Sequence, residues 1–146
     1  MEKLEKSYFR LTSAPDPSTV RPQPVLQAAL ARMDTLKRNY WYDNDQMKAM
    51  RQDLTVQRIR SAFTVRVYEY HARLALRAAD WGEFNQCQTV LGTLYDEGLP
   101  GASHEFLAYR ILYSTFNGST SLQMLAVLAK LNAEVMQDPA VQHALE

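Results

Sequence analysis

The sequence predicts an all-α protein built from antiparallel helical hairpins. Apolar residues recur three and four positions apart through most of the chain after residue 23, which is the spacing of a helix that buries one face. No segment shows the strict alternation of apolar and polar residues that a half-buried strand requires. Glycine, proline, asparagine and aspartate stand between the periodic segments, where they end one helix and cap the next. These observations predict seven helices and no sheet.

Residues 1–23 are expected to form an extended, proline-rich arm. Four of the six prolines of the chain lie between residues 15 and 24, and proline fixes φ and lacks the amide hydrogen that a helix needs. We expect Leu11 and Val20 to hold the arm against the helices. Residues 24–146 are expected to be one helical-repeat domain, truncated at its C-terminal end, because apolar residues continue at helical spacing up to Leu145.

The first two helices are predicted to meet near residue 43. Pro24 suits the first position of a helix, and apolar residues keep helical spacing from Val25 to Trp41, which predicts a helix over 24–42. Asp43 or Asn44 is expected to cap a shorter helix that ends near Leu54.

The stretch RQDLTVQRIR, Arg51 to Arg60, is predicted to be an elbow with a basic rim. The β-branched pair Thr55 and Val56 weakens a helix where the chain changes direction. Asp53 is expected to cap or to pair locally.

Five more helices are expected after the elbow: 61–78, 81–97, 103–116, 120–136 and a last one from Asp138. The third and fourth helices are expected to form one hairpin and the fifth and sixth another, offset by roughly 38 residues, which lies within the range of helical repeats. The turn from Ala78 to Phe84 resembles the turn between the two helices of a tetratricopeptide unit. The third helix is apolar on two flanks, so it is expected to be covered by neighbours on both.

Composition excludes several classes of function. The chain has 16 basic and 16 acidic residues, so binding to nucleic acid or to an anionic membrane would require local clustering. Cys87 is the single cysteine, which excludes an intrachain disulfide and a cysteine-rich zinc site and favours the nucleus or cytosol. No apolar run reaches the roughly 18–20 residues that cross a bilayer.

No residue pattern points to catalysis, a cofactor or a metal ion. His71, His104 and His143 lie on different expected helices without the spacing of metal ligands, and His71 is expected to be a hydrogen-bonded core side chain. Cys87 falls on a buried face and is expected to act as a small hydrophobic residue. We therefore predict that the chain is not an enzyme.

A cluster of basic residues is the candidate contact surface for a partner or a nucleic acid. Between Met47 and Arg77 the chain has seven basic residues against two acidic ones, arginine suits phosphate or carboxylate, and tyrosine adds a stacking surface. A structural role is the alternative, because arginine stems often cover apolar surface. The candidate residues are Arg51, Arg58, Arg60, Arg66, Tyr70, Arg73 and Arg77.

Several ordered motifs resemble one known family. They are RLTSAPDPSTVRP (10–22), QMKAMRQDLTVQRIR (46–60), VYEYHARLAL (67–76), EFNQCQTVLGTLY (83–95), LPG (99–101) and EFLAYRILY (105–113). The motifs are similar to those of the SAC/GANP family of nuclear mRNA-processing and export scaffolds, most of all to the branch of leukocyte receptor cluster member eight and the fungal THP-type proteins. The resemblance covers most of residues 8–146.

The resemblance implies a fold, partners and a function. The implied fold is a right-handed superhelical array of tetratricopeptide-like hairpins that runs into a winged helix and forms a PCI-type module, and this chain is expected to end before the winged helix. Family members pair with a second PCI-domain protein and a small acidic DSS/SEM-type protein, and they act in transcription, splicing and mRNA export. The expected function is a non-catalytic scaffold in the nucleus, with a cytoplasmic pool as a further option. Direct RNA or DNA binding by the Arg51–Arg77 surface is the alternative.

Overall fold

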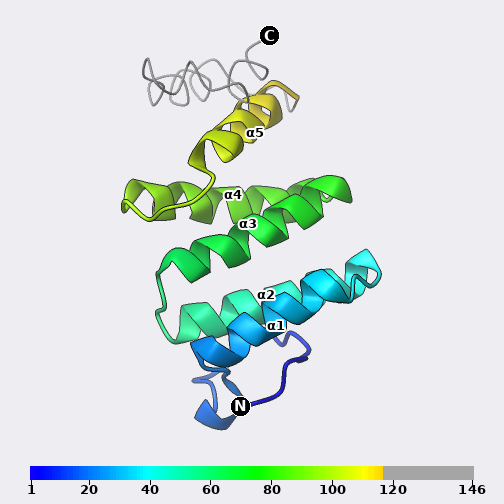
Figure 1. Ribbon diagram of the computed structural model, residues 1–146, viewed down its shortest axis with the longest axis vertical. Helices are drawn as coiled ribbons and strands as arrows, with labels where there is room; N and C mark the ends of the chain where they lie inside the picture. The colour runs from blue at the N-terminus through cyan, green and yellow to red at the C-terminus, as the bar shows by residue number, and fades with distance from the viewer. Residues whose placement is uncertain (117–146) are drawn as a thin grey trace. The chain divides into compact units, whose positions relative to one another are not determined.

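The computed structural model describes residues 1–116, and it confirms the all-α class (Figure 1). The described residues contain five α-helices, one short 3-10 helix at Pro17–Thr19 and no strand. The chain divides into two compact units, Met1–Gly101 and the part that begins at Ala102, and each is described by itself. The sixth and seventh expected helices lie outside the described residues.

The first two helices meet earlier than the sequence indicated. α1 spans Gln23–Thr35 and α2 spans Tyr40–Val56, so the prediction of one helix over 24–42 was wrong. The chain breaks here because Asn39 caps α2, its side-chain oxygen accepting a hydrogen bond from the Tyr42 amide at 2.9 Å. Trp41 keeps the apolar spacing of the first helix, but it lies in the first turn of α2 and is 73% exposed.

The elbow after α2 also begins later than predicted. Both Thr55 and Val56 belong to α2 despite their branched side chains. The turn follows them and includes Arg58 with a φ of 55°. The Ile59 amide closes the turn by donating to the Leu54 carbonyl oxygen at 3.0 Å. Leu54 itself is buried.

The next two helices form the hairpin that the sequence predicts. α3 spans Ala62–Arg77 and α4 spans Trp81–Asp96. Asp80 caps α4 by accepting a hydrogen bond from the Glu83 amide at 3.3 Å. Successive helices pack on one another, α1 on α2, α2 on α3 and α3 on α4. α3 is therefore covered on both flanks, and the unit has the character of a helical-repeat array.

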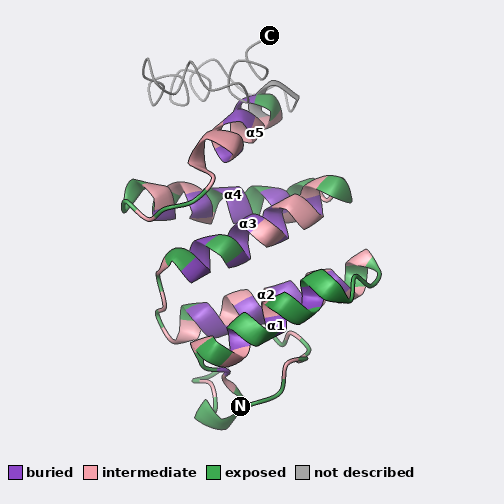
Figure 2. Cartoon of the chain, in the orientation of Figure 1, coloured by how far each residue is buried: buried purple, intermediate pink, exposed green. Residues whose placement is uncertain are grey.

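Buried residues lie along α1, α2, α3 and α4 (Figure 2), and two apolar layers hold the Met1–Gly101 unit together. The first joins α1, α2 and α3, and the second lies between α3 and α4. The buried side chains of the first layer are Leu26, Ala29, Met33, Met47, Met50, Leu54, Phe63 and Val67. The buried apolar side chains that α4 contributes to the second are Phe84, Cys87, Leu91 and Leu94.

The second unit begins with α5, which spans Ser103–Phe116 as the sequence predicts. Phe106, Ala108 and Ile111 are buried on this helix. The rings of Phe106 and Tyr109 meet edge to face, with centroids 5.2 Å apart. None of the described helices is long and apolar enough to span a membrane.

Candidate functional site

Four of the seven candidate contact residues form a row on α3. Arg66, Tyr70, Arg73 and Arg77 follow one another in steps of four, three and four residues, which return to the same side of a helix. Arg66 and Arg77 are exposed, whereas Arg73 and Tyr70 are half-buried. The Arg66 guanidinium also lies 5.4 Å from the centre of the Phe63 ring. We call Arg66, Arg73 and Arg77 the α3 arginine row.

The other three candidates lie elsewhere and in different environments. Arg58 is exposed in the turn between α2 and α3. Arg60 is also exposed but is paired with Glu97, whose carboxylate accepts hydrogen bonds from Nε at 3.1 Å and from Nη2 at 2.8 Å. An exposed pair of this kind contributes little stability. Arg51 points into the interior, with its side chain only 15% exposed.

Arg51 joins three helices through its guanidinium. From α2 it pairs with the Glu83 carboxylate on α4, donates to Nδ1 of His71 on α3 at 3.2 Å, and lies 3.7 Å from the Cys87 sulfur. The guanidinium also sits 5.1 Å from the centre of the Tyr68 ring. Removing one partner of such a buried ion pair is costly, because the other charge is left without compensation.

The contacts of His71 fix its charge state. Nδ1 accepts from Arg51, so Nε2 carries the proton and donates it to Oδ1 of Asn44 at 2.6 Å. Burial, reinforced by the nearby Arg51 and Lys48 charges, lowers the pKa of His71 to about 3. His71 is therefore a neutral, hydrogen-bonded core side chain near pH 7, which confirms the prediction.

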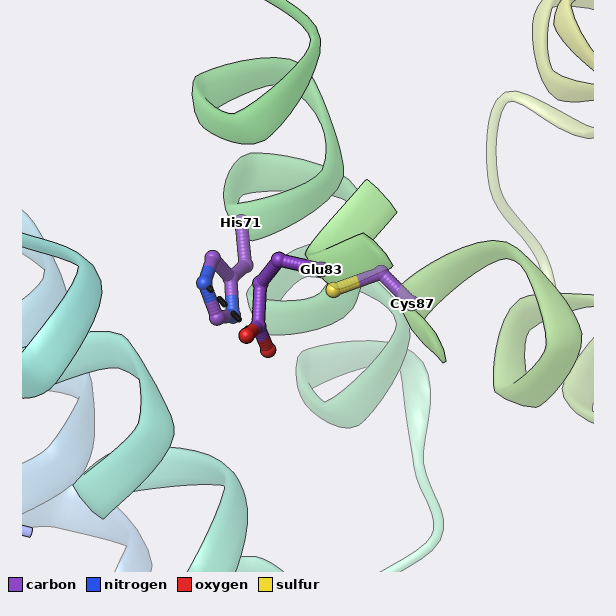
Figure 3. Close-up of side chains that lie close together, drawn as sticks. All are labelled: His71, Glu83 and Cys87. Carbon is purple, nitrogen blue, oxygen red and sulfur yellow. Dashed lines mark ion pairs between the residues drawn. The ribbon is translucent and has the colours of Figure 1, made fainter. Parts of the chain in front are cut away.

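His71, Glu83 and Cys87 form the group of described side chains whose geometry comes nearest to that of a metal site (Figure 3). One ligand atom from each lies within 4.8 Å of the others, and His71 Nε2 is 3.9 Å from Glu83 Oε1. The Arg51 guanidinium contacts all three side chains, so an internal cation already occupies this position. Burial raises the pKa of the Cys87 thiol to about 12, despite Arg51 beside it. With Arg51 as the cation beside it, the Cys87 sulfur therefore keeps its proton near pH 7.

The arm is held by charges, by hydrogen bonds and by Leu4, which packs against the apolar layer of α1, α2 and α3. Val20 is half-buried, but Leu11 does not hold the arm as expected. Leu11 is 44% exposed. Instead Asp53 of α2 accepts from Arg21 Nε and from Lys6 Nζ, both at 2.7 Å. Arg21 is fully buried and also donates to the Leu4 carbonyl oxygen at 2.9 Å.

These contacts correct the prediction that Asp53 caps or pairs locally. Its two partners lie 47 and 32 positions away along the chain. The role of Arg21 was not predicted, because its partner is also far away along the chain. The sequence does offer one signal: Arg21 is a basic residue in a proline-rich arm and has no acidic residue next to it.

A surface groove of about 330 Å³ lies beside the arm and was not foreseen from the sequence. We call it the arm groove. The arm and helices α2, α3 and α4 contribute its walls. Its main lining residues are Tyr8, Leu11, Lys48, Gln52, Tyr68 and Gln86.

Comparison with curated proteins finds close relatives, although no protein-family model matches the chain. A THP3 homolog of Schizosaccharomyces pombe is 55% identical over 99% of this chain, which covers 37% of that protein. SAC3 family protein A of Arabidopsis thaliana is 51% identical over 99% of this chain and 14% of its own length. A leukocyte receptor cluster member 8 homolog of Xenopus laevis is 50% identical over 99% of this chain and 18% of its own length.

The relatives confirm the resemblance that the sequence motifs indicated. The chain spans 14% to 37% of the length of these three proteins, so what they do as whole proteins does not pass directly to it. Identity of half or more over nearly every residue is nevertheless specific. Over nearly all of its length, the chain is therefore similar to one part of these longer SAC3- and THP3-named proteins.

Proposed function

We propose that this chain is a non-catalytic scaffold, a protein-interaction domain of a nuclear complex that acts in transcription-coupled mRNA processing and export. The observation that carries the proposal is identity of 51% and 55% to SAC3- and THP3-named proteins over 99% of the chain. The role itself is the one that the resemblance to the SAC/GANP family implies.

The state of the reactive side chains supports a non-catalytic role. His71 is neutral and enclosed by Arg51 and Asn44, and Cys87 is fully buried with a raised pKa. Glu83 is neutralised by Arg51. A general base or nucleophile must reach a substrate proton or carbon, and these groups face one another instead.

The proposed partners are a second PCI-domain protein and a small acidic DSS/SEM-type protein. Because the chain spans at most 37% of the length of the three relatives described, we expect this pairing to need the rest of the natural protein. The proposed location is the nucleus, with a cytoplasmic pool as an addition. This region would then act as the helical support on which the assembly is built.

A comparison within the longer natural protein tests the proposal. A tagged natural protein and a version that lacks residues 1–101, which form one compact unit, would be expressed in cells depleted of the endogenous protein. We expect the shortened protein to recover less of the PCI-domain partner and to leave polyadenylated RNA in the nucleus. Unchanged recovery together with normal RNA distribution would refute the scaffold role.

Direct nucleic-acid binding is the second candidate, because the α3 arginine row places three cations on one face. Arg51 and Arg60 already have acidic partners, so we expect any such binding to depend mainly on the exposed Arg66 and Arg77 of the row, with Arg58 as a further exposed cation. Binding of the chain to a labelled 20-nucleotide RNA at ~50 mM salt should weaken steeply as salt is raised.

The double variant Arg66→Glu, Arg77→Glu provides the specific test, since both side chains are exposed. The variant should fold normally and lose RNA binding if the row is the contact. Equal binding by the variant, or no binding by the wild type at low salt, would exclude this second function for the chain.

A further inference from the structure

The arm groove has an exposed apolar edge supplied by the arm. Gln52 Nε2 on α2 donates to the Phe9 carbonyl oxygen at 2.7 Å, and the Tyr8 amide donates to the Asp45 carboxylate at 3.3 Å. These contacts fix the arm backbone along α2 while the Phe9 and Leu11 side chains remain 73% and 44% exposed. Exposed aromatic and aliphatic side chains next to a groove are typical of a protein-binding site.

The described lining of the groove includes cations and no carboxylate. Of the two lining cations, Arg51 is paired with Glu83, whereas Lys48 is not in an ion pair with any described residue. Asp45, which accepts a hydrogen bond from the Tyr8 amide, is not part of the lining. Arg10, on the arm beside Leu11, is exposed. Among the described residues, Lys48 and Arg10 make no ion pair, so they remain available to a negatively charged ligand.

The rings in the groove are poorly placed to stack on nucleic-acid bases. Lys48 Nζ lies 4.6 Å from the centre of the Tyr8 ring, and the Arg51 guanidinium lies 5.1 Å from the centre of the Tyr68 ring. Each cation covers one ring face, and Tyr68 is also buried, with 6% of its surface exposed. Binding of single strands relies on open aromatic faces, so the groove favours carboxylates over bases.

We infer that the arm groove docks an extended acidic peptide segment of a protein partner, one that alternates carboxylate and apolar side chains. Lys48 and Arg10 attract the carboxylates, and Phe9 and Leu11 contact the apolar side chains. The Gln86 amide and the amide oxygen of Gln52, whose Nε2 is already bonded to Phe9, bond the peptide backbone. The inference deepens the proposed scaffold function and rests on it, because it gives the interaction domain a specific surface and a partner chemistry.

Fluorescence anisotropy with a designed probe tests the inference. The probe is a fluorescein-labelled octapeptide in which aspartate alternates with leucine or phenylalanine, and its control carries asparagine in place of every aspartate. We expect the 146-residue chain to bind the acidic probe. It should bind the control at least about tenfold more weakly, because asparagine carries no charge for the cations to attract. Binding of the acidic probe should also weaken with salt.

Three variants locate the site. Lys48→Glu should weaken probe binding about tenfold or more by placing like charges together, and Gln86→Trp should do so by filling the groove without changing its charge. Lys37→Glu is the matched control, because it makes the same charge change in the exposed loop between α1 and α2, and it should bind like the wild type. Circular dichroism checks that each variant is folded.

Several outcomes would overturn the inference. They are no binding of the acidic probe, equal binding of the asparagine control, equal loss with Lys37→Glu, or tighter binding of a labelled decauridylate at the same groove. If the probe fails while the longer natural protein still recovers its PCI-domain partner, the groove proposal falls and the scaffold function stands. If the partner is lost from the shortened protein and Lys48→Glu also loses the probe, both are supported.

Discussion

Ala79 lies in the left-handed backbone region, with a φ of 57° in the turn between α3 and α4. This conformation costs an L-residue roughly 1–2 kcal/mol, while glycine adopts it freely at an entropic cost of about 0.5–1 kcal/mol in the unfolded chain. We expect Ala79→Gly to raise the free energy of unfolding by about 0.5–1 kcal/mol, measured by urea denaturation.

The neighbouring Ala78 gives the matched control, because its φ of −89° is ordinary. Ala78→Gly should lower the free energy of unfolding by about 0.5–1 kcal/mol. If both glycine variants changed stability in the same direction, the strain at Ala79 would not be the cause.

Gly101 is the residue at which an added methyl group would collide with the hairpin. A Cβ there would lie 2.6 Å from Val65 Cγ1, 2.7 Å from Glu69 Oε2 and 3.1 Å from Tyr95 Cε1. Glu69 and Tyr95 hold each other with a 2.5 Å hydrogen bond, so neither can move away without cost. We expect Gly101→Ala to destabilise the protein by about 1–3 kcal/mol, as measured by thermal and urea unfolding.

Gly82 provides the comparison, because the nearest atom to its added Cβ is 4.0 Å away in an open helical turn. Gly82→Ala should stabilise the protein by up to about 1 kcal/mol through its helix propensity. A Gly101→Ala protein as stable as the wild type would show that the chain can shift at this point.

His71 links stability to pH. Its pKa is lowered to about 3 in the folded protein from an ordinary value of 6.5, so between these values the unfolded chain binds a proton that the folded chain does not. The contribution is complete above pH 6.5 and is lost as the pH falls, by at most about 1.4 kcal/mol per pH unit. Urea unfolding at pH 7, 6 and 5 should reveal this slope, and His71→Gln should flatten it. An equal slope in the variant would assign the effect to other groups.

At the scale of the elements, the arm is an extended segment whose two buried or half-buried cations share one carboxylate. Asp53 is 1% exposed and neutralises Arg21, which is fully buried, and Lys6, which is 15% exposed. Removing the carboxylate leaves a buried guanidinium with no counter-charge. We expect Asp53→Ala to cost about 3–5 kcal/mol and to make residues 1–22 susceptible to limited proteolysis before the helices unfold.

Lys6→Ala is the matched change, since it leaves the Arg21–Asp53 pair intact and removes only the more exposed cation. It should cost about 1 kcal/mol or less. Equal effects of the two substitutions would show that burial of Arg21 is not what makes Asp53 important.

Local signals explain which elements the sequence predicted well. The α3–α4 hairpin was predicted to within a residue or so, because Asp80 caps α4 and Gly98, with a φ of 86°, follows its end. The α1–α2 break was predicted too far along the chain, because Tyr40 and Trp41 continue the apolar spacing across the Asn39 cap. Asn39 is a strong capping residue, but a pattern read for hydrophobicity alone passes over it.

At the scale of the whole molecule, the candidate site was harder to predict than the fold because its contacts join distant parts of the sequence. Arg51 meets Glu83 across 32 residues, and Gln52 meets the arm across 43. Charge counting located a basic region but could not tell a solvated arginine from a paired one, so Arg51 and Arg66 appeared equivalent. The arm groove forms only when the arm lies along α2, and no local sequence pattern predicts that packing.

The position of Arg51 has a consequence for how the stability of the protein responds to loss of metal ions. Its guanidinium occupies the space among an imidazole, a carboxylate and a thiol in which other proteins hold zinc, and it is covalently attached to the chain. Chelators such as EDTA, or starvation for trace metals, would dismantle a joint made with a free ion. Here the cation that joins the three helices is a side chain of the protein itself, so a chelator cannot remove it.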